Sequence, residues 1–264
     1  MRCVMGINHA TSGGAVWFAA TATLPALGTD LFPLAPMGVL AGALVCSGAA
    51  LLPDADHHSG TIAHSVPVLG RLTARALEET SGGHRHGAHT LFAGAVVTLL
   101  AVLIGRITAV VPLLGLVPIG PAIATIALVC FALKARDVVK RWSIAWFLGL
   151  VAGAAVLAFS PDSPVWFPVA VALGFLTHIA GDLLTVEGVP SLLWPIQPRP
   201  PRALRGAPVL GALWKRNGYI AFPVLGHAGS MREHVLGIVL GLYCLYAFAA
   251  VAMEAGNIHL IVGL

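Results

Sequence analysis

Histidine and acidic residues, the side chains best suited to hold a divalent metal ion, gather in four short segments of this 264-residue chain. In one of them, His178 and Asp182 are spaced i, i+4, which places both side chains on one face of a helix. Imidazole nitrogen and carboxylate oxygen are the usual donors of open, catalytic zinc sites. The residues that we predict as ligands of one or more divalent ions, zinc first among them, are His9, Asp54, Asp56, His57, His84, His89, His178 and Asp182.

Two further catalytic roles can be assigned around such a metal. One of Asp54 and Asp56 could act as a general base instead of a ligand, and we place Asp56 first in this role. Arg85 could neutralise charge that develops on a phosphate, because its guanidinium is planar and permanently charged. His86, in the same turn, could be an extra ligand or a surface residue. Each cluster has an alternative: His178 and Asp182 could be a hydrogen-bonded pair that packs two helices together. The segment 53–58 could be a helix stop with solvated polar residues, and the turn 84–90 could bind lipid headgroups.

The long apolar segments of the chain must position these residues. Hydrophobic residues make up 58% of the chain and charged residues only 10%, whereas roughly a quarter of a soluble domain is charged. A helix needs about 20 apolar residues to cross a bilayer. We therefore predict an all-α, polytopic transmembrane helix bundle that forms a single integral membrane domain over residues 1–264. Its spans, about seven, are expected at residues 10–28, 34–52, 89–110, 114–133, 142–160, 164–184 and 234–253.

The basic residues predict how the bundle is oriented. With seven spans, every Lys and Arg except Arg106 lies on the side of the N-terminus, together with the loops 53–88 and 185–233. Cytoplasmic loops carry an excess of Lys and Arg. We therefore expect the protein in the cell (inner or plasma) membrane with this face in the cytoplasm. All four His/Asp clusters fall on the same face, although the orientation is assigned from Lys and Arg alone. The segment around Leu69 in the first loop predicts an interfacial helix.

The order of these motifs resembles the YdjM-type family of membrane-bound, metal-dependent hydrolases, some of which are described as LexA-regulated. The resemblance extends over most of the chain, from His9 to about Glu233. The matching features are His9 followed by small residues, LLPDADH at 51–57, the turn with His84, Arg85, His89 and Thr90, the pattern H-x-x-x-D-x-x-T from His178 to Thr185, Gly188, and LLWP at 192–195.

The resemblance implies the class of reaction. The family's proposed kinship with zinc-dependent phospholipase C and related nucleases implies phosphoester hydrolysis, with His-x-x-x-Asp as the shared ligand motif. A site at the membrane surface favours a lipid or lipid-linked substrate over a soluble one. The sequence departs from the family pattern at His86, where glycine is usual, and at Ala88, where threonine is usual. The resemblance therefore leaves the geometry of that turn open.

Other classes of function use the same donors. A metal-binding membrane transporter or sensor without hydrolytic activity is the main alternative. A transporter would place its donors at mid-membrane depth in broken helices, whereas these lie at predicted helix ends. A purely structural membrane protein is a third interpretation. Nucleic acid is not expected as the main partner, because the basic residues form short clusters between apolar runs and no basic stripe. Glu233 could support the site or be a solvated charge, and the sequence predicts no oligomeric state.

Overall fold

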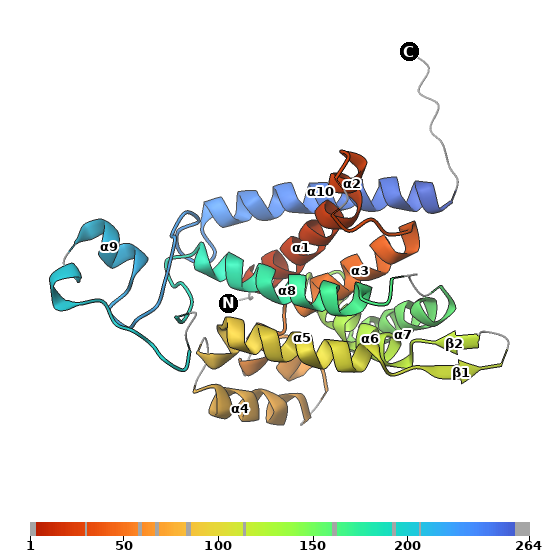
Figure 1. Cartoon of the computed structure of the whole chain (residues 1–264), viewed down its shortest axis with the longest axis horizontal. Coiled ribbons are helices and arrows are strands. Elements are labelled where there is room, and N and C mark those ends of the chain that lie inside the picture. Colours follow the sequence, from red (N-terminus) through yellow and green to blue (C-terminus); the bar gives the residue numbers. More distant parts are fainter. Residues whose placement is uncertain are drawn as a thin grey trace, which may run out of the picture.

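The structure is a computed structural model that describes residues 4–29, 31–57, 60–66, 69–82, 86–112, 115–159, 163–191, 194–205 and 207–256. Long helices dominate it, and they run roughly alongside one another in a bundle (Figure 1). These long helices are α1 (Val4–Phe18), α3 (Pro36–Ala49), α5 (Leu91–Gly105), α6 (Ile119–Ala135), α7 (Trp142–Ala158), α8 (Trp166–Leu183) and α10 (Met231–Ala255).

Short elements connect the long helices. α1 continues through a π-helical turn, η1 (Ala19–Thr23), into α2 (Leu24–Ala26). A two-stranded antiparallel hairpin between α5 and α6 pairs β1 (Ala109–Val111) with β2 (Gly115–Val117). The remaining short helices are the 3-10 turns η2 (Pro53–Asp56), η3 (Ile62–His64), η4 (Gly87–His89) and η5 (Arg202–Leu204), and the α-helices α4 (Leu69–Ser81) and α9 (Pro208–Leu213).

Helix α3 lies at the centre of the bundle, where it packs against α1, α6 and α8. Two glycines permit this close approach. A Cβ added at Gly48 of α3 would overlap the carbonyl oxygen of Leu128 in α6, and one added at Gly174 of α8 would overlap that of Cys46 in α3. Small residues at such positions let membrane helices approach closely. The tight packing of α3 on α8 brings the carboxyl ends of these two helices together, and both ends carry predicted ligands.

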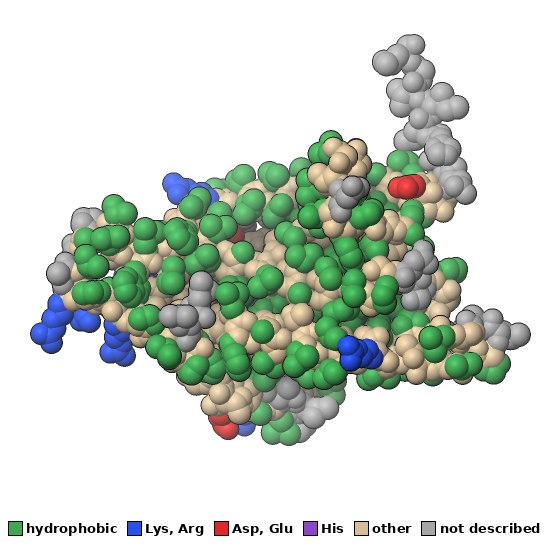
Figure 2. Space-filling model, in the orientation of Figure 1, with side chains coloured by type: hydrophobic (Ala, Val, Ile, Leu, Met, Phe, Trp, Pro, Cys, Tyr) green, Lys and Arg blue, Asp and Glu red, His purple; other side chains and the backbone are tan. Residues whose placement is uncertain are grey.

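The outer surface is apolar. Among the described residues, three helical segments are long and apolar enough to cross a membrane, namely Pro36–Asp56, Trp166–Leu183 and Met231–Ala255, while α5, α6 and α7 are shorter apolar helices. On α10, Ile238 and Leu242 are both 63% exposed. Figure 2 shows hydrophobic side chains over most of one face, with Lys and Arg mainly toward the end that carries α9. An exposed apolar surface of this extent belongs in lipid. Seven spans and a cytoplasmic orientation stay predictions.

Each predicted span contains a long helix, but several boundaries differ. α1 begins at Val4, so that His9 lies within the helix and not before it. The prediction of one span over 89–110 was wrong at its end, because α5 stops at Gly105 and the β1–β2 hairpin follows. Pro112 follows β1 directly, seven residues beyond the end of α5, and has no N–H with which a helix could continue across the hairpin. The helix predicted around Leu69 is confirmed as α4.

Candidate metal centre

Five of the predicted donors meet where α1 and α5 begin and where α3 and α8 end. Two groups of donors share His178, and the donor atoms within each group lie within 4.8 Å of one another. The first group comes from α1 and α8, and the second combines η2, η4 and α8. Their members are His9, His178 and Asp182 in the first group, and Asp54, His89 and His178 in the second.

His178 is the residue that both groups share, and a hydrogen bond on the side of the ring away from the cluster fixes its orientation. Its Nδ1 lies 2.7 Å from the carbonyl oxygen of Ala50, just past the end of α3. A carbonyl oxygen only accepts, so Nδ1 carries the proton and the Nε2 lone pair faces the cluster. A hydrogen bond of this kind is what orients a metal-binding histidine. Nε2 is buried and has no hydrogen-bond partner among the described residues.

The distances between donor atoms fit a shared cation. Nε2 of His178 lies 3.6 Å from Oδ2 of Asp182 and 3.9 Å from Oδ1 of Asp54. Nε2 of His89 lies 3.5 Å from Oδ1 of Asp54 and 3.6 Å from Oδ2 of Asp182. Hydrogen bonds between nitrogen and oxygen are typically about 2.7–3.2 Å long. Two ligands about 2.1 Å from one tetrahedral ion lie about 3.4 Å apart. The donors present therefore fit a divalent ion in both chemistry and spacing.

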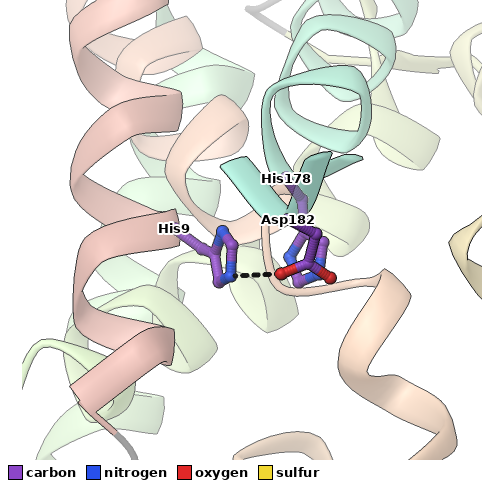
Figure 3. Close-up of side chains that lie close together, drawn as sticks. All are labelled: His9, His178 and Asp182. Carbon is purple, nitrogen blue, oxygen red and sulfur yellow. Dashed lines mark ion pairs between the residues drawn. The ribbon is translucent and has the colours of Figure 1, made fainter. Parts of the chain in front are cut away.

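His9 joins the cluster from α1. Its Nε2 lies 3.5 Å from Oδ1 of Asp182, and its ring stacks on that of His178 with centroids 3.8 Å apart. Figure 3 shows His9 reaching across from α1 toward the two side chains of α8. Gly181 makes room for this ring, because a Cβ at that position would lie 3.1 Å from Cε1 of His9. The absence of a side chain at Gly181 thus allows the first helix to contribute a donor.

The two aspartates of η2 have different surroundings. The side chain of Asp54 is 17% exposed and faces His89 and His178, whereas that of Asp56 is fully buried. Oδ2 of Asp56 lies 3.8 Å from Nδ1 of His89, the ring nitrogen other than the one near Asp54. Asp56 thus lies behind His89. This is the place of a carboxylate that orients a ligand and raises its basicity.

The turn before α5 fixes His89. Thr90 caps the helix, since its Oγ1 accepts a hydrogen bond from the backbone N–H of Ala93 and its hydroxyl donates to the carbonyl of Gly87. The side chain of His89 is 1% exposed, so its ring is held away from bulk water.

The structure does not bring every predicted site residue into the cluster. His57 follows η2, is half-buried and belongs to neither group of described donors, so its role as a ligand stays a prediction. His84 and Arg85 lie outside the described residues. The ring of His86 lies against Tyr219, with centroids 5.9 Å apart, and His86 is likewise in neither group.

A polar link beside His9 was missed by sequence reasoning. Nδ2 of Asn8 donates to Oε1 of Glu233 at 2.6 Å, and the backbone N–H of Gly229 donates to Oε2 of Glu233 at 2.6 Å. Glu233 is buried, so it is not a solvated charge. His9, Asn8 and Glu233 line a cavity of about 160 Å³ that also reaches Asp182. The position of Asn8 next to His9 was the one signal in the sequence that could have indicated this link.

The fold and the cluster together define a helical membrane protein with a group of buried side chains able to hold a metal ion. A comparison with protein-family models matches the description "YdjM inner membrane protein" over residues 4–256. The chain belongs to this family, which confirms the resemblance noted from its motifs. No curated protein and no solved structure matches the chain.

Proposed function

We propose that this protein is a membrane-embedded, divalent-metal-dependent hydrolase that acts on the phosphoester of a lipid or lipid-linked substrate. The observation that carries the proposal is the convergence of donors from four distant segments, His9, Asp54, His89, His178 and Asp182, around the oriented ring of His178. Burying carboxylates and imidazoles together is costly unless a cation or hydrogen bonds offset the loss of water. A shared divalent ion accounts for these residues better than direct pairing at 3.5–3.9 Å does.

The residues of the cluster would have different roles in this reaction. When bound, a divalent ion polarises a phosphoryl oxygen and lowers the pKa of a coordinated water toward neutrality. His178 and Asp182 would supply its ligands from α8, and His9 and His89 would complete the set from α1 and η4. Asp54 is the partly exposed carboxylate of the cluster, so it is better placed than buried Asp56 to accept a proton from an entering water.

Asp56 would then act through His89. Asp56 is fully buried and its Oδ2 lies 3.8 Å from Nδ1 of His89, so a small approach would let the carboxylate accept a hydrogen bond from Nδ1 and hold the ring with Nε2 toward the cluster. This role differs from the ligand and base roles that the sequence predicted for Asp56. It makes Asp56 a positioning residue, whose loss should weaken metal binding by roughly 10- to 100-fold without abolishing it.

The proposal is tested by metal content and turnover in the same preparations. Detergent-purified protein, Asp54→Ala and His178→Ala would be analysed for bound metal, for release of inorganic phosphate from phosphatidic acid, and for release of the headgroup from phosphatidylglycerol. His64→Ala is the matched control, since His64 is exposed and in neither group of donors. We expect stoichiometric metal and turnover in the unmodified protein and in His64→Ala, loss of both in His178→Ala, and loss of turnover with the metal retained in Asp54→Ala.

Other results would count against a hydrolase. Folded protein that retains no metal after supplementation with zinc, manganese or iron would contradict the metal centre itself. Bound metal with no turnover of any phosphoester, combined with metal flux into reconstituted vesicles, would instead support the transporter. The donors lie near helix ends and not in a broken helix at mid-bundle. This location supports a hydrolase over a transporter.

A further inference from the structure

A cavity of about 350 Å³ adjoins the metal centre on the side of Asp56. Its walls come from η2, α4, η4, α5 and α8, and from Trp194. This volume is at the lower end of the range of about 300–1,000 Å³ that is usual for small-molecule sites. The cavity is separate from the smaller one beside His9, because the two share no lining residue.

The walls of this cavity are hydrocarbon along most of its length. Ala93, Val97 and Leu100 follow one another at i, i+4 and i+7 and form a single stripe of α5. Leu77 of α4 and Phe175 of α8 complete the apolar lining. A lining of this kind offers few hydrogen-bond partners to a polar ligand, so the shape and chemistry suit a hydrocarbon chain.

Asp56 separates the cavity from the cluster of donors, none of which is among the residues that line it. Asp56 is the one charged side chain among the described residues that line it. Oδ2 of Asp56 lies 3.8 Å from Nδ1 of His89, and the other ring nitrogen of His89 faces Asp54 and Asp182. A molecule in the cavity would therefore have one end a single side chain away from the metal centre.

The other end opens onto the apolar outer surface. Phe92 and Leu100 of α5 are 56% and 52% exposed, and Leu77 of α4 is 39% exposed. These residues line the cavity and also face outward, where α5 presents further apolar side chains such as Leu99 and Leu103. In a bilayer such a surface contacts lipid, so a lipid tail could enter sideways between α4 and α5 without crossing water.

We infer that this cavity binds one acyl chain of a membrane lipid and so places the lipid's phosphoester beside the metal centre. The inference depends on the proposed function in one respect only, namely that this lipid is the substrate of the hydrolase. Binding of the chain depends on the apolar walls and needs neither metal nor turnover. The chain enters from bilayer hydrocarbon and not from water, so its binding depends on how well it fits the cavity and not on a hydrophobic transfer free energy. A bulky side chain placed in the cavity should therefore exclude the chain and lower its occupancy.

Photolabelling tests the inference directly. The full chain would be reconstituted in phosphatidylethanolamine and phosphatidylglycerol vesicles that contain phosphatidic acid with a diazirine near the end of one acyl chain. After illumination, mass spectrometry would locate the labelled residues. We expect label concentrated on α4, on α5 and around Trp194, and displaced by unlabelled phosphatidic acid.

Matched substitutions distinguish labelling inside the cavity from labelling at the lipid-facing surface. Ala93→Trp fills the cavity, whereas Ala95→Trp adds the same side chain to an exposed position of α5 that does not line it. Leu77→Trp and Leu72→Trp form a second pair on α4, of which only Leu77 lines the cavity. We expect labelling inside the cavity to fall at least tenfold in Ala93→Trp and in Leu77→Trp, and to stay within twofold in the two controls.

The outcomes for the cavity and for the proposed function are distinguishable. Label spread evenly over the outward faces of α5 and α10, and equally insensitive to all four substitutions, would overturn the acyl-chain site. If Ala93→Trp fails to fold, as judged by gel filtration, the Leu77 pair decides. Selective labelling of a protein that binds no metal would support the acyl-chain site while contradicting the hydrolase.

Discussion

Nδ1 of His178 lies 2.7 Å from the carbonyl oxygen of Ala50, a contact that ties the side chain of α8 to the end of α3. We expect this hydrogen bond to keep the ring in one tautomer whether or not metal is bound. In nitrogen-15 spectra of histidine-labelled protein, the Nδ1 resonance of His178 should stay that of a protonated nitrogen, while the Nε2 resonance should shift on addition of zinc. A proton found on Nε2 instead would contradict the assignment of Nε2 as the ligand.

Gly181→Ala should weaken metal binding. The new Cβ would lie 3.1 Å from Cε1 and 3.2 Å from Nδ1 of His9, so the ring must shift by a few tenths of an ångström. We expect metal affinity to fall by roughly 10- to 100-fold, the range seen when a residue that orients a ligand is changed. Competition with a chromogenic chelator would measure it. Gly241→Ala is the control, because no atom within 4 Å would meet its Cβ. Equal affinities in the two variants would argue that His9 is not a ligand.

Glu233→Ala should destabilise the fold. Glu233 accepts hydrogen bonds from the Asn8 side chain and from the N–H of Gly229, and its own N–H is capped by Ser230. Removing the carboxylate leaves two donors without their acceptor, which should lower the free energy of unfolding by about 1–3 kcal/mol. Denaturant unfolding in detergent would measure the loss. Glu254→Ala, at an exposed position of the same helix, should change stability little. Similar stability of both variants would show that the link contributes nothing.

Removal of metal should lower the thermal stability of the unmodified protein. A ligand that binds only the folded state stabilises it by about 2.7 kcal/mol when its concentration is 100 times its dissociation constant. Addition of a chelator should therefore lower the melting temperature in detergent. His178→Ala, which lacks the donor shared by both groups, should melt at the same temperature with and without chelator. A chelator effect of equal size in this variant would point to a metal bound elsewhere.

The sequence predicted the helices well wherever an apolar run was long and uninterrupted. α8 and α10 coincide with their predicted spans to within a few residues, because length and hydropathy alone define such helices. Between α5 and α6 the same reasoning failed. Ala109–Val111 and Gly115–Val117 are as apolar as the helices beside them, and only Pro112 and the hairpin register distinguish them. Periodicity cannot separate a short apolar strand from helix in such runs.

For the site, the sequence predicted which residues would be near one another but not how they are held. Hydropathy and charge predict every cluster on one face of the bilayer, and this is enough to predict His9, His89 and His178 in one neighbourhood. The partner of His178 is a main-chain carbonyl, at Ala50, and no pattern of residue types marks such an atom. The different surroundings of Asp54 and Asp56 likewise depend on how η2 turns after α3 and are not encoded in their spacing.

The donors of the metal centre are spread along the chain from His9 to Asp182, and this order has a consequence for biosynthesis. Chains are made from the N-terminus, and their early segments fold or insert while later ones are still being translated. Because α8 supplies His178 and Asp182, the centre cannot be complete until α8 has joined the earlier helices in the membrane. Nascent chains that end before α8 carry an incomplete set of ligands. Under the proposed function, loading of the ion would therefore be a late step in maturation, and the membrane-inserted protein would acquire its metal only after translation has passed α8.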